Sequence, residues 1–385
     1  MAKTRVAQFR RGMARLGFEA VRRPGLMFLR SMRAIPAVRN HLIPALLKEE
    51  RAGIPASQAV DTVRQELRRL QKTTGPIVIG PWVGEVGFEL LYWIPFLNWA
   101  LREYELDRRR LIVVSRGGAG RWYRHLTSEY LDVFSLFTLD EYRQANEARW
   151  DKAGHQKQYR VEQMDRDIFD RAKERAGLQQ AELLHPSLMY RILRFYWFEK
   201  AGIGLLDRHT EFRRLAPIER TAALKDLPAD YIAVRFYFRP SFPDTPENQR
   251  FAAHVIRSLS EEIPVVLLNT GLRLDDHEDM DVPGKNIYRV DDLMRLEQNL
   301  EIQTEIISHA RAFVGTYGGL AYLGPFYGVP SVSFYSTEEE LVPAHLDVSW
   351  RLGRTMGVSV TTLHTKMAGL LRGALSGLQS PRHST

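Results

Sequence analysis

No cysteine occurs among the 385 residues of the chain. This absence excludes disulfide bonds, thiolate zinc sites, iron–sulfur clusters and cysteine nucleophiles, and it is typical of proteins in a reducing compartment. No stretch approaches the roughly 20 uninterrupted apolar residues that span a membrane. The patterns GxxxxGKS/T, GxGxxG, GxSxG and HExxH are also missing. P-loop, dinucleotide-binding, serine-hydrolase and zinc-protease functions therefore lack their defining residues.

Acidic residues are scarce at the N-terminus. Residues 1–40 contain ten lysines and arginines against one acid, Glu19, whereas the net charge of the whole chain is +8. The rest of the chain is close to neutral, so we expect no nucleic acid as a partner. The arginines are too many for a secretory signal peptide, which favours a cytoplasmic protein.

The same segment carries apolar residues between its arginines, with Phe9, Met13 and Leu16 at helical spacing. Such a segment can lie on anionic lipid headgroups, which would place the protein peripherally at the inner membrane face. Two other interpretations stay open, namely a helix packed on the rest of the protein and a disordered basic arm. We interpret residues 1–75 as a basic helical extension.

Short apolar runs alternate with helical patterns from residue 76 onward. The pattern predicts strands at 76–79, 111–114, 133–138, 231–236, 264–268, 286–290, 312–314 and 331–334. It predicts helices at 88–103, 121–130, 248–259, 300–310 and 319–327. Such alternation requires crossover connections and a parallel sheet covered on both faces. We expect an α/β protein with two Rossmann-like domains, 76–215 and 225–350, facing each other across a cleft, followed by a C-terminal helix and tail, 351–385.

A glycine-rich turn follows the strand predicted at 312–314. The strand ends in Gly315-Thr316, the chain turns through Gly318-Gly319, and a helix is predicted from there. Free backbone N–H groups and the helix dipole at such a turn suit a phosphate, and glycine lets an anion approach the amides. The alternative is that these glycines serve only tight packing between strand and helix.

Two segments resemble parts of GT-B fold glycosyltransferases. Residues 313–334 resemble the donor-site segment of that fold, and residues 80–89 resemble its glycine-rich first loop. The resemblance implies a nucleotide diphosphate sugar as co-substrate, with no bound cofactor, and a glycan or lipid-linked acceptor in cell-surface polysaccharide synthesis. The donor contacts expected in the first segment are Gly315, Thr316, Tyr317, Gly318 and Gly319. The residues expected to line the cleft on the acceptor side are Trp82, Gly84, Gly87 and His185.

Two arginines, Arg235 and Arg239, leave the first strand of the second predicted domain. Their position resembles the basic loop of fucosyltransferase-like and heptosyltransferase-like members. A guanidinium there can neutralise the charge that develops on the departing diphosphate without a metal. We expect at most one of the two at the diphosphate, and the other can instead form a surface ion pair. Asn269 and Thr270 follow another buried strand and are expected at the edge of a nucleobase pocket.

Two acids in an otherwise apolar segment, Glu85 and Glu89, are candidates for the general base that takes the proton of an acceptor hydroxyl. The alternative is that they stabilise the N-terminus of the following helix. His125 and His185 are further candidates, although a lone histidine beside aromatic residues is usually a hydrogen-bonded structural residue.

A metal site is not expected. The triplets Asp165-Arg166-Asp167 and Asp279-Met280-Asp281 match a DxD pattern, but a chain with 46 acids contains such triplets by chance. The sequence therefore predicts a metal-independent glycosyltransferase. Two alternatives remain, namely a two-lobed protein that binds a phosphorylated ligand without turnover, and a sugar-nucleotide epimerase of similar build.

Overall fold

The computed structural model describes residues 55–153, 157–272, 280, 282–339 and 341–370. The chain divides into two compact units, residues 1–58 and 59–385, and both sheets belong to the second. The predictions for residues 1–40 and for Asp279 and Asp281 lie outside the described residues. Within the described ranges, every helix is too short or too polar to cross a membrane.

The first sheet has four parallel strands in the order β3-β2-β1-β4. They are β1 (Ile77–Ile79), β2 (Leu111–Ser115), β3 (Tyr130–Asp132) and β4 (Glu182–Leu184). The central strand β1 is fully buried, and Ile79 at its end pairs with Val113 and Leu184. A strand that is apolar throughout is what a parallel sheet covered on both faces requires.

Helices cover this sheet. They are α4 (Ala56–Lys72), α5 (Val86–Phe88), α6 (Ile94–Glu103), α7 (Val133–Leu136), α8 (Leu139–Ala153), α9 (Gln163–Arg175), α10 (Ser187–Trp197) and α11 (Gly204–Asp207). Side chains of α7, α8 and α9 form one core with Val78 and Val114. Another part of the core is aromatic, because the buried Trp82 ring stacks on Trp93 and Tyr190.

Between α5 and α6 the chain forms a π-helix, Glu89–Trp93. Its wider turn is closed by a bond from the amide of Ile94 to the carbonyl of Glu89. All five of its side chains are buried. A single π-helical turn inserted between helices is frequent at functional sites.

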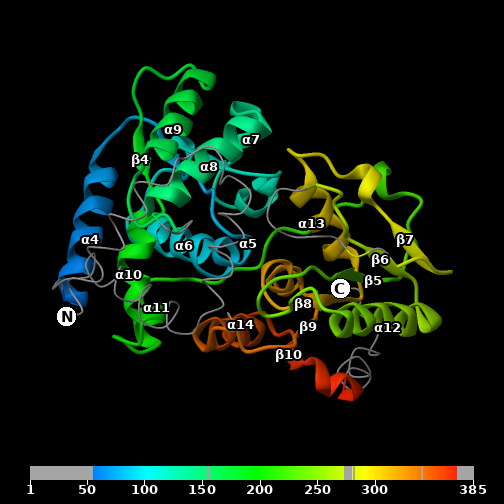
Figure 1. The fold of residues 1–385 in the computed structure, drawn as a ribbon. Coiled ribbons are helices and arrows are strands. Elements are labelled where there is room, and N and C mark those ends of the chain that lie inside the picture. Colours follow the sequence, from blue (N-terminus) through cyan, green and yellow to red (C-terminus); the bar gives the residue numbers. More distant parts are fainter. Residues whose placement is uncertain (1–54, 154–156, 273–279, 281, 340, 371–385) are drawn as a thin grey trace, which may run out of the picture. The chain divides into compact units, whose positions relative to one another are not determined.

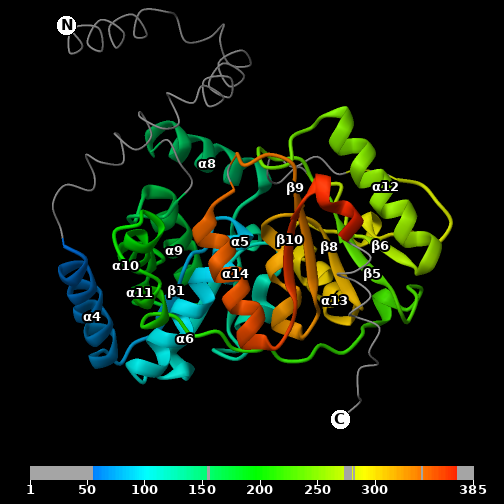
Figure 2. The same ribbon diagram turned by 90° about the horizontal axis from the view of Figure 1, so that it is seen from below.

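The second sheet has six parallel strands in the order β10-β9-β8-β5-β6-β7. They are β5 (Ile232–Arg235), β6 (Val265–Leu267), β7 (Ile287–Arg289), β8 (Ala312–Thr316), β9 (Ser331–Tyr335) and β10 (Val360–His364). Figure 1 shows α12 (Pro246–Glu262) and α13 (Asn299–His309) on opposite sides of this sheet. Figure 2 shows β10, β9 and β8 side by side, with α14 (Pro343–Met356) next to them.

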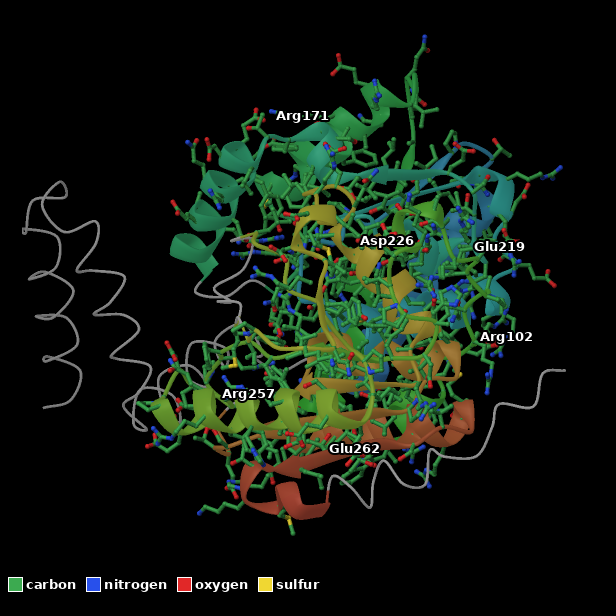
Figure 3. The ribbon with its side chains drawn as sticks, turned by 90° about the vertical axis from the view of Figure 1, so that its right-hand side faces the viewer. Arg102, Arg171, Glu219, Asp226, Arg257 and Glu262 are labelled. Atoms are coloured by element: carbon green, nitrogen blue, oxygen red, sulfur yellow. The ribbon has the colours of Figure 1, made fainter. Side chains whose placement is uncertain are left out.

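The core of the second sheet explains this arrangement. Alternate residues of β5, Ile232 and Val234, contact the buried side of α12, where Ala252 and Ile256 lie. On α13, the carbonyl of Ile306 accepts a hydrogen bond of 2.8 Å from the hydroxyl of Tyr231. The polar side of α12 faces outward, and its Arg257 and Glu262 are exposed (Figure 3).

Most predicted elements are present, and two parallel α/β sheets are confirmed. The strand predicted at 133–138 is wrong, because the third strand is β3 and the helix α7 follows it. Asp132 explains the change, since its carboxylate accepts a hydrogen bond of 2.9 Å from the amide of Phe134 and caps α7. The helix predicted at 121–130 is a 3₁₀ turn, Ala119–Tyr123. Strands β4 and β10 were not predicted, and β10 continues the second sheet beyond residue 350.

The helix predicted at 319–327 is also wrong. The chain forms two short 3₁₀ turns there, Gly319–Tyr322 and Gly324–Tyr327. Glycine and proline at 324 and 325 disfavour a continuous α-helix. A Cβ at Gly324 would moreover lie 2.8 Å from the carbonyl oxygen of Val329, so the segment folds tightly back on itself. An α-helix dipole therefore does not act at Gly318-Gly319, and charge at this turn must come from side chains.

Candidate functional site

The two glycine-rich segments singled out in the sequence lie against each other. A Cβ at Gly87 would be 3.2 Å from the amide nitrogen of Gly319 and 3.3 Å from the ring of Tyr322. The first segment follows β1 and the second follows β8, so each lies beyond the carboxyl end of a central strand of its sheet. In open parallel sheets, ligands bind at these ends.

Arg239 covers the turn at Gly318. A Cβ at Gly318 would lie 2.6 Å from Nη1 of Arg239, and φ of this glycine is +101°. The same Nη1 donates a hydrogen bond of 3.4 Å to the carbonyl of Tyr317. Tyr237 is the other neighbour, because its hydroxyl would lie 3.1 Å from a Cβ at Gly319. A larger residue at either glycine would displace this guanidinium or this hydroxyl.

The loop that carries Arg239 is held by backbone hydrogen bonds. Arg239 and Phe242 exchange two of them, of 3.0 and 2.8 Å, and the carbonyl of Ser241 accepts another of 2.9 Å from the amide of Ser336. The side chain of Thr337 donates to the carbonyl of Pro240 at 2.8 Å. The backbone of the loop that carries Arg239 is therefore held by the residues that follow β9.

Arg235 points elsewhere. It is buried, and its guanidinium donates to the carbonyl of Leu268, which follows β6. Of the two arginines, Arg239 lies over the turn after β8, and Arg235 is buried rather than in a surface ion pair. The hydrogen bond of Arg235 to Leu268 joins the end of β5 to the loop after β6.

Gly315, Thr316 and Tyr317, three of the expected donor contacts, hold the backbone and side chains that lead into the turn at Gly318-Gly319. A Cβ at Gly315 would overlap the carbonyl oxygen of Arg235, so glycine is needed for close pairing of β8 with β5. The buried Thr316 hydroxyl accepts from the amide of Tyr237 and donates to its carbonyl, each at 3.0 Å. Tyr317 is buried and presents its carbonyl to Arg239. These residues position Tyr237 and Arg239.

Glu85 stands beside the contact of the two glycine segments and forms an ion pair. Its carboxylate lies 2.9 Å from Nζ of Lys157, and the side chain is 50% exposed. The ammonium of Lys157 also lies 3.2 Å from the centre of the Phe88 ring. The positive charge of Lys157 and, further away, that of Arg239 lower the pKa of Glu85 to about 2. Glu85 is therefore an ionised carboxylate held by a cation.

His345 completes the group from the start of α14. Its Nδ1 lies 2.5 Å from the hydroxyl of Tyr92, and its ring meets Phe88 edge-on at 4.8 Å. Burial, together with the positive charges of Lys157 and Arg239, lowers the pKa of His345 to about 3. The imidazole is therefore neutral at physiological pH. Lys157 and His345 are absent from the sequence-based site, since neither belongs to a motif that would reveal it.

A buried polar network fixes the backbone next to Lys157. Gln158 donates to the carbonyl of Pro81 at 2.8 Å and to Asp165 at 2.9 Å, and its side-chain oxygen accepts from the amide of Val83 at 3.2 Å. Arg149 donates to both carboxylate oxygens of Asp165, at 2.9 and 2.7 Å. Lys157 is thereby tied to the glycine loop that carries Glu85.

His185 and the acid of the first DxD triplet belong to this network. His185 is 3% exposed, its Nε2 lies 3.4 Å from Asp165, and its Nδ1 accepts from the amide of Ser187 at 3.1 Å. The structure therefore corrects the expectation that His185 lines an accessible site. Among the described residues, no group of three or more metal-binding side chains comes together.

Glu89 is in a different environment from Glu85. It is 1% exposed, and one carboxylate oxygen accepts from Ser115 at 2.6 Å and from Tyr123 at 2.5 Å. Burial raises its pKa to about 7. A side chain so enclosed cannot touch an acceptor, so Glu89 is corrected to a structural residue. His125, the other histidine candidate, lies 2.6 Å from Asn98, and burial lowers its pKa to about 4.

The remaining predicted site residues, Trp82, Gly84, Asn269 and Thr270, contact other parts of the protein. Trp82 is fully buried in the aromatic core, and a Cβ at Gly84 would lie 3.0 Å from its ring, which corrects the expectation that Trp82 meets an acceptor. Asn269 is buried and donates to the carbonyl of Met280 at 2.7 Å. Thr270 accepts from the amide of Leu272 at 3.2 Å. Asn269 and Thr270 thus hold the loop after β6.

No family model matches the chain, and no curated protein sequence does. Among solved structures, the chain is similar to the E. coli heptosyltransferase WaaC with ADP, at 11% identity and a TM-score of 0.44, over 79% of this chain and 99% of that one. It is similar to the E. coli ADP-heptose lps heptosyltransferase II, at 12% identity and a TM-score of 0.41, over 80% and 100% of the two chains. It is also similar to the UDP-GlcNAc 2-epimerase of Methanocaldococcus jannaschii, at 12% identity and a TM-score of 0.36, over 80% and 93%.

Proposed function

We propose that the protein is a glycosyltransferase that moves a sugar from a nucleotide diphosphate sugar to an acceptor hydroxyl. The observation that carries the proposal is the meeting of Gly87 and Gly319, which brings Arg239, Lys157 and Glu85 to one place. Each glycine segment lies beyond the carboxyl end of a strand, where parallel sheets bind ligands. An acid and two cations beside them are the groups that such a transfer needs.

The diphosphate of the donor is expected at the turn after β8. Arg239 lies over Gly318, and Lys157 lies over the ring of Phe88, which follows Gly87. As the bond to the sugar breaks, negative charge develops on the departing nucleoside diphosphate, and preorganised cations stabilise that charge. Two cationic side chains can supply this stabilisation in place of a divalent metal, so we propose metal-independent transfer.

Glu85 is the proposed general base. It is the acid in this group whose side chain reaches solvent, whereas Glu89 is enclosed by Ser115 and Tyr123. A carboxylate can take the proton of the acceptor hydroxyl as the new glycosidic bond forms. In the ion pair with Lys157 its pKa of about 2 makes it a poor base, so this pair must loosen before the proton moves.

The acceptor is proposed to be a glycan or lipid-linked molecule of cell-surface polysaccharide synthesis. The ten basic residues of segment 1–40 support a position at the inner face of an anionic membrane, where such acceptors are made. The protein would then be cytoplasmic and peripheral to the membrane.

Binding of nucleoside diphosphates tests the proposal. ADP, UDP, GDP, CDP and dTDP are added separately, in excess EDTA, and the melting temperature is measured. At least one of them is expected to raise it, and R239Q is expected to weaken that binding about 10- to 100-fold, as for a charge-assisted contact. R257Q is the matched control, because Arg257 is exposed on α12. Absence of any shift in the wild-type protein contradicts the proposal.

A second candidate is a protein that binds the same ligand without turnover. The ion pair that holds Glu85 favours it, because the pair leaves the carboxylate weakly basic. Both candidates bind nucleotide, and only an enzyme releases nucleoside diphosphate from a nucleotide sugar. Product analysis also separates transfer from epimerisation, since an epimerase converts the donor without an acceptor.

A further inference from the structure

Lys157 interacts through its ammonium with two neighbours, the carboxylate of Glu85 and the aromatic ring of Phe88. Its ammonium lies 2.9 Å from the carboxylate of Glu85 and 3.2 Å from the centre of the Phe88 ring. Phe88 follows Gly87, which touches Gly319 of the opposite segment. The cation thus contacts the candidate base and the residue next to Gly87, which lies against the turn proposed to hold phosphate.

We infer that Lys157 is an exchangeable cation that couples ligand binding to the release of Glu85. In the free protein the ammonium pairs with Glu85. When a diphosphate occupies the turn at Gly318-Gly319 beside Arg239, the ammonium moves to its oxygens, and the carboxylate of Glu85 loses its partner. This inference rests on the proposed function, and it assigns to Lys157 a role that the resting geometry alone does not show.

The exchange is favourable on charge. A diphosphate offers several oxygens and more than one negative charge, whereas Glu85 offers one charge in a half-exposed position. Exposed ion pairs of this kind are weak, because water screens them. A ligand at Arg239 also cancels part of the positive charge that now stabilises Glu85, since Arg239 acts on Glu85 as well.

The side chain can move while its backbone stays in place. Gln158 is buried and anchored to Pro81, Val83 and Asp165, so residue 157 cannot drift away from the glycine loop. The ammonium stands on a flexible four-carbon stem that can turn between two anions. The moving part is therefore confined to a few torsions of one side chain.

The groups that face Glu85 decide what happens after the exchange. They are Lys157 from the segment before α9, Arg239 from the loop after β5, and His345 from α14; Tyr190 of α10 senses the charge of Glu85 as well. His345 is neutral at physiological pH, so it does not replace the lost cation. With Lys157 withdrawn and Arg239 neutralised by phosphate, Glu85 becomes a stronger base at the moment when the donor is bound.

A double-mutant cycle on ligand affinity tests the exchange. The nucleoside diphosphate that stabilises the wild-type protein most is titrated by calorimetry, at low salt, into wild type, K157M, E85Q and the double variant. K157M is expected to weaken binding about tenfold, because the ligand loses a charge-assisted contact. E85Q is expected to tighten it about two- to fivefold, since Lys157 then no longer pairs with a competing carboxylate. In the K157M background, E85Q is expected to give less than about half of that gain.

Matched controls come from the same domain. Lys173 also lies over an aromatic ring, that of Phe169, and pairs with Asp170 at 2.8 Å, so K173M repeats the chemistry of K157M away from the site. E141Q removes an acid that pairs with Arg171 at 3.0 Å. Neither control should change affinity. K157Q is measured as well, to separate loss of charge from loss of side-chain length, and melting curves verify that each variant folds.

The outcomes are distinguishable. If E85Q leaves affinity unchanged or weakens it while K157M still weakens it, Lys157 binds ligand without exchanging, and the inference fails while the proposed function stands. If K157M has no effect, Lys157 does not meet the ligand and the inference fails. If E85Q tightens binding equally with and without Lys157, the gain is only relief of repulsion and the inference again fails. If wild type binds none of the nucleotides, the proposed function fails first.

Discussion

Two acids four residues apart, Glu85 and Glu89, have opposite environments. Glu85 lies in an extended loop, half-exposed, with a cation 2.9 Å away, and its pKa is lowered to about 2. Glu89 begins the π-helix, is 1% exposed, and has a pKa raised to about 7 by burial. In a regular α-helix residues at this spacing share a face. Here the loop ends after Glu85, so the two side chains point into different surroundings. Spacing alone therefore does not show which acid can react.

The largest expected effect is on turnover of a Glu85 variant. Glu85→Gln removes the proposed base while keeping the shape of the side chain, and general-base catalysis contributes roughly 10²- to 10⁴-fold. Once the sugar nucleotide is identified, the transfer rate should fall by about that factor while nucleoside diphosphate still binds. Because the pair with Lys157 is half-exposed, the free energy of unfolding should change by less than about 1 kcal/mol. A variant with full activity would remove Glu85 from the mechanism.

The next effect is on stability, at Glu89. Its folded-state pKa of about 7 lies above the ordinary value of 4.5, so the protonated acid is favoured in the fold. The stability it contributes is fully present below about pH 4.5 and is lost as the pH rises through 7. The loss is on the order of 3 kcal/mol. Glu89→Gln should remove this slope and unfold at higher urea than wild type at pH 8.

Urea unfolding at pH 5 and pH 8 measures that effect, with Glu141→Gln as an exposed control. Equal pH slopes in wild type and in Glu89→Gln would mean that Glu89 does not titrate in the fold as described. An activity loss in Glu89→Gln as large as that of Glu85→Gln would reverse the assignment of the two acids.

A smaller effect is expected from Ser115, which donates to Glu89 at 2.6 Å. This hydrogen bond stabilises the ionised carboxylate and so lowers its pKa. Ser115→Ala should therefore move the pH-dependent loss of stability to higher pH and cost about 1 to 2 kcal/mol at pH 8, as a hydrogen bond to a charged group does. Ser135→Ala, at a hydroxyl that bonds only a backbone carbonyl of its own helix start, serves as the comparison. An unchanged titration midpoint would contradict the prediction.

Short apolar strands and the glycine turns could be predicted from the sequence, because each is a local pattern. The strand period could not have shown that Arg235 and Arg239 separate, because residues four apart on a strand share a face. They separate because β5 ends at Arg235 and Arg239 lies in the loop that follows. What escaped prediction depends on contacts between distant segments. Lys157 reaches Glu85 across a network that joins Gln158 to Pro81, and nothing near residue 157 indicates this. The edge strand β10 is defined by its pairing with β9, and all five of its residues are half-buried, with no alternation of buried and exposed side chains.

The helix predicted at 319–327 is a case in which a local pattern predicted an element that the chain does not form. A glycine followed by apolar residues suits a helix start, yet the chain forms two 3₁₀ turns in which Gly324 closely approaches the carbonyl of Val329. The anion-binding idea therefore moves from the amides of a helix to the guanidinium of Arg239. The proposed phosphate site at Gly318-Gly319 therefore owes its positive charge to a side chain and not to a helix dipole.

The π-helix Glu89–Trp93 also fixes the number of residues between Glu85 and α6. An α-helix turns about 100° per residue, so removing one residue here would rotate α6 by that amount relative to Glu85. Trp93 would then leave its stack with Trp82, and the aromatic core would open. Homologues that keep this core should consequently carry no deletions between residues 85 and 94, a constraint that a genetic selection with codon-deleted libraries would reveal directly.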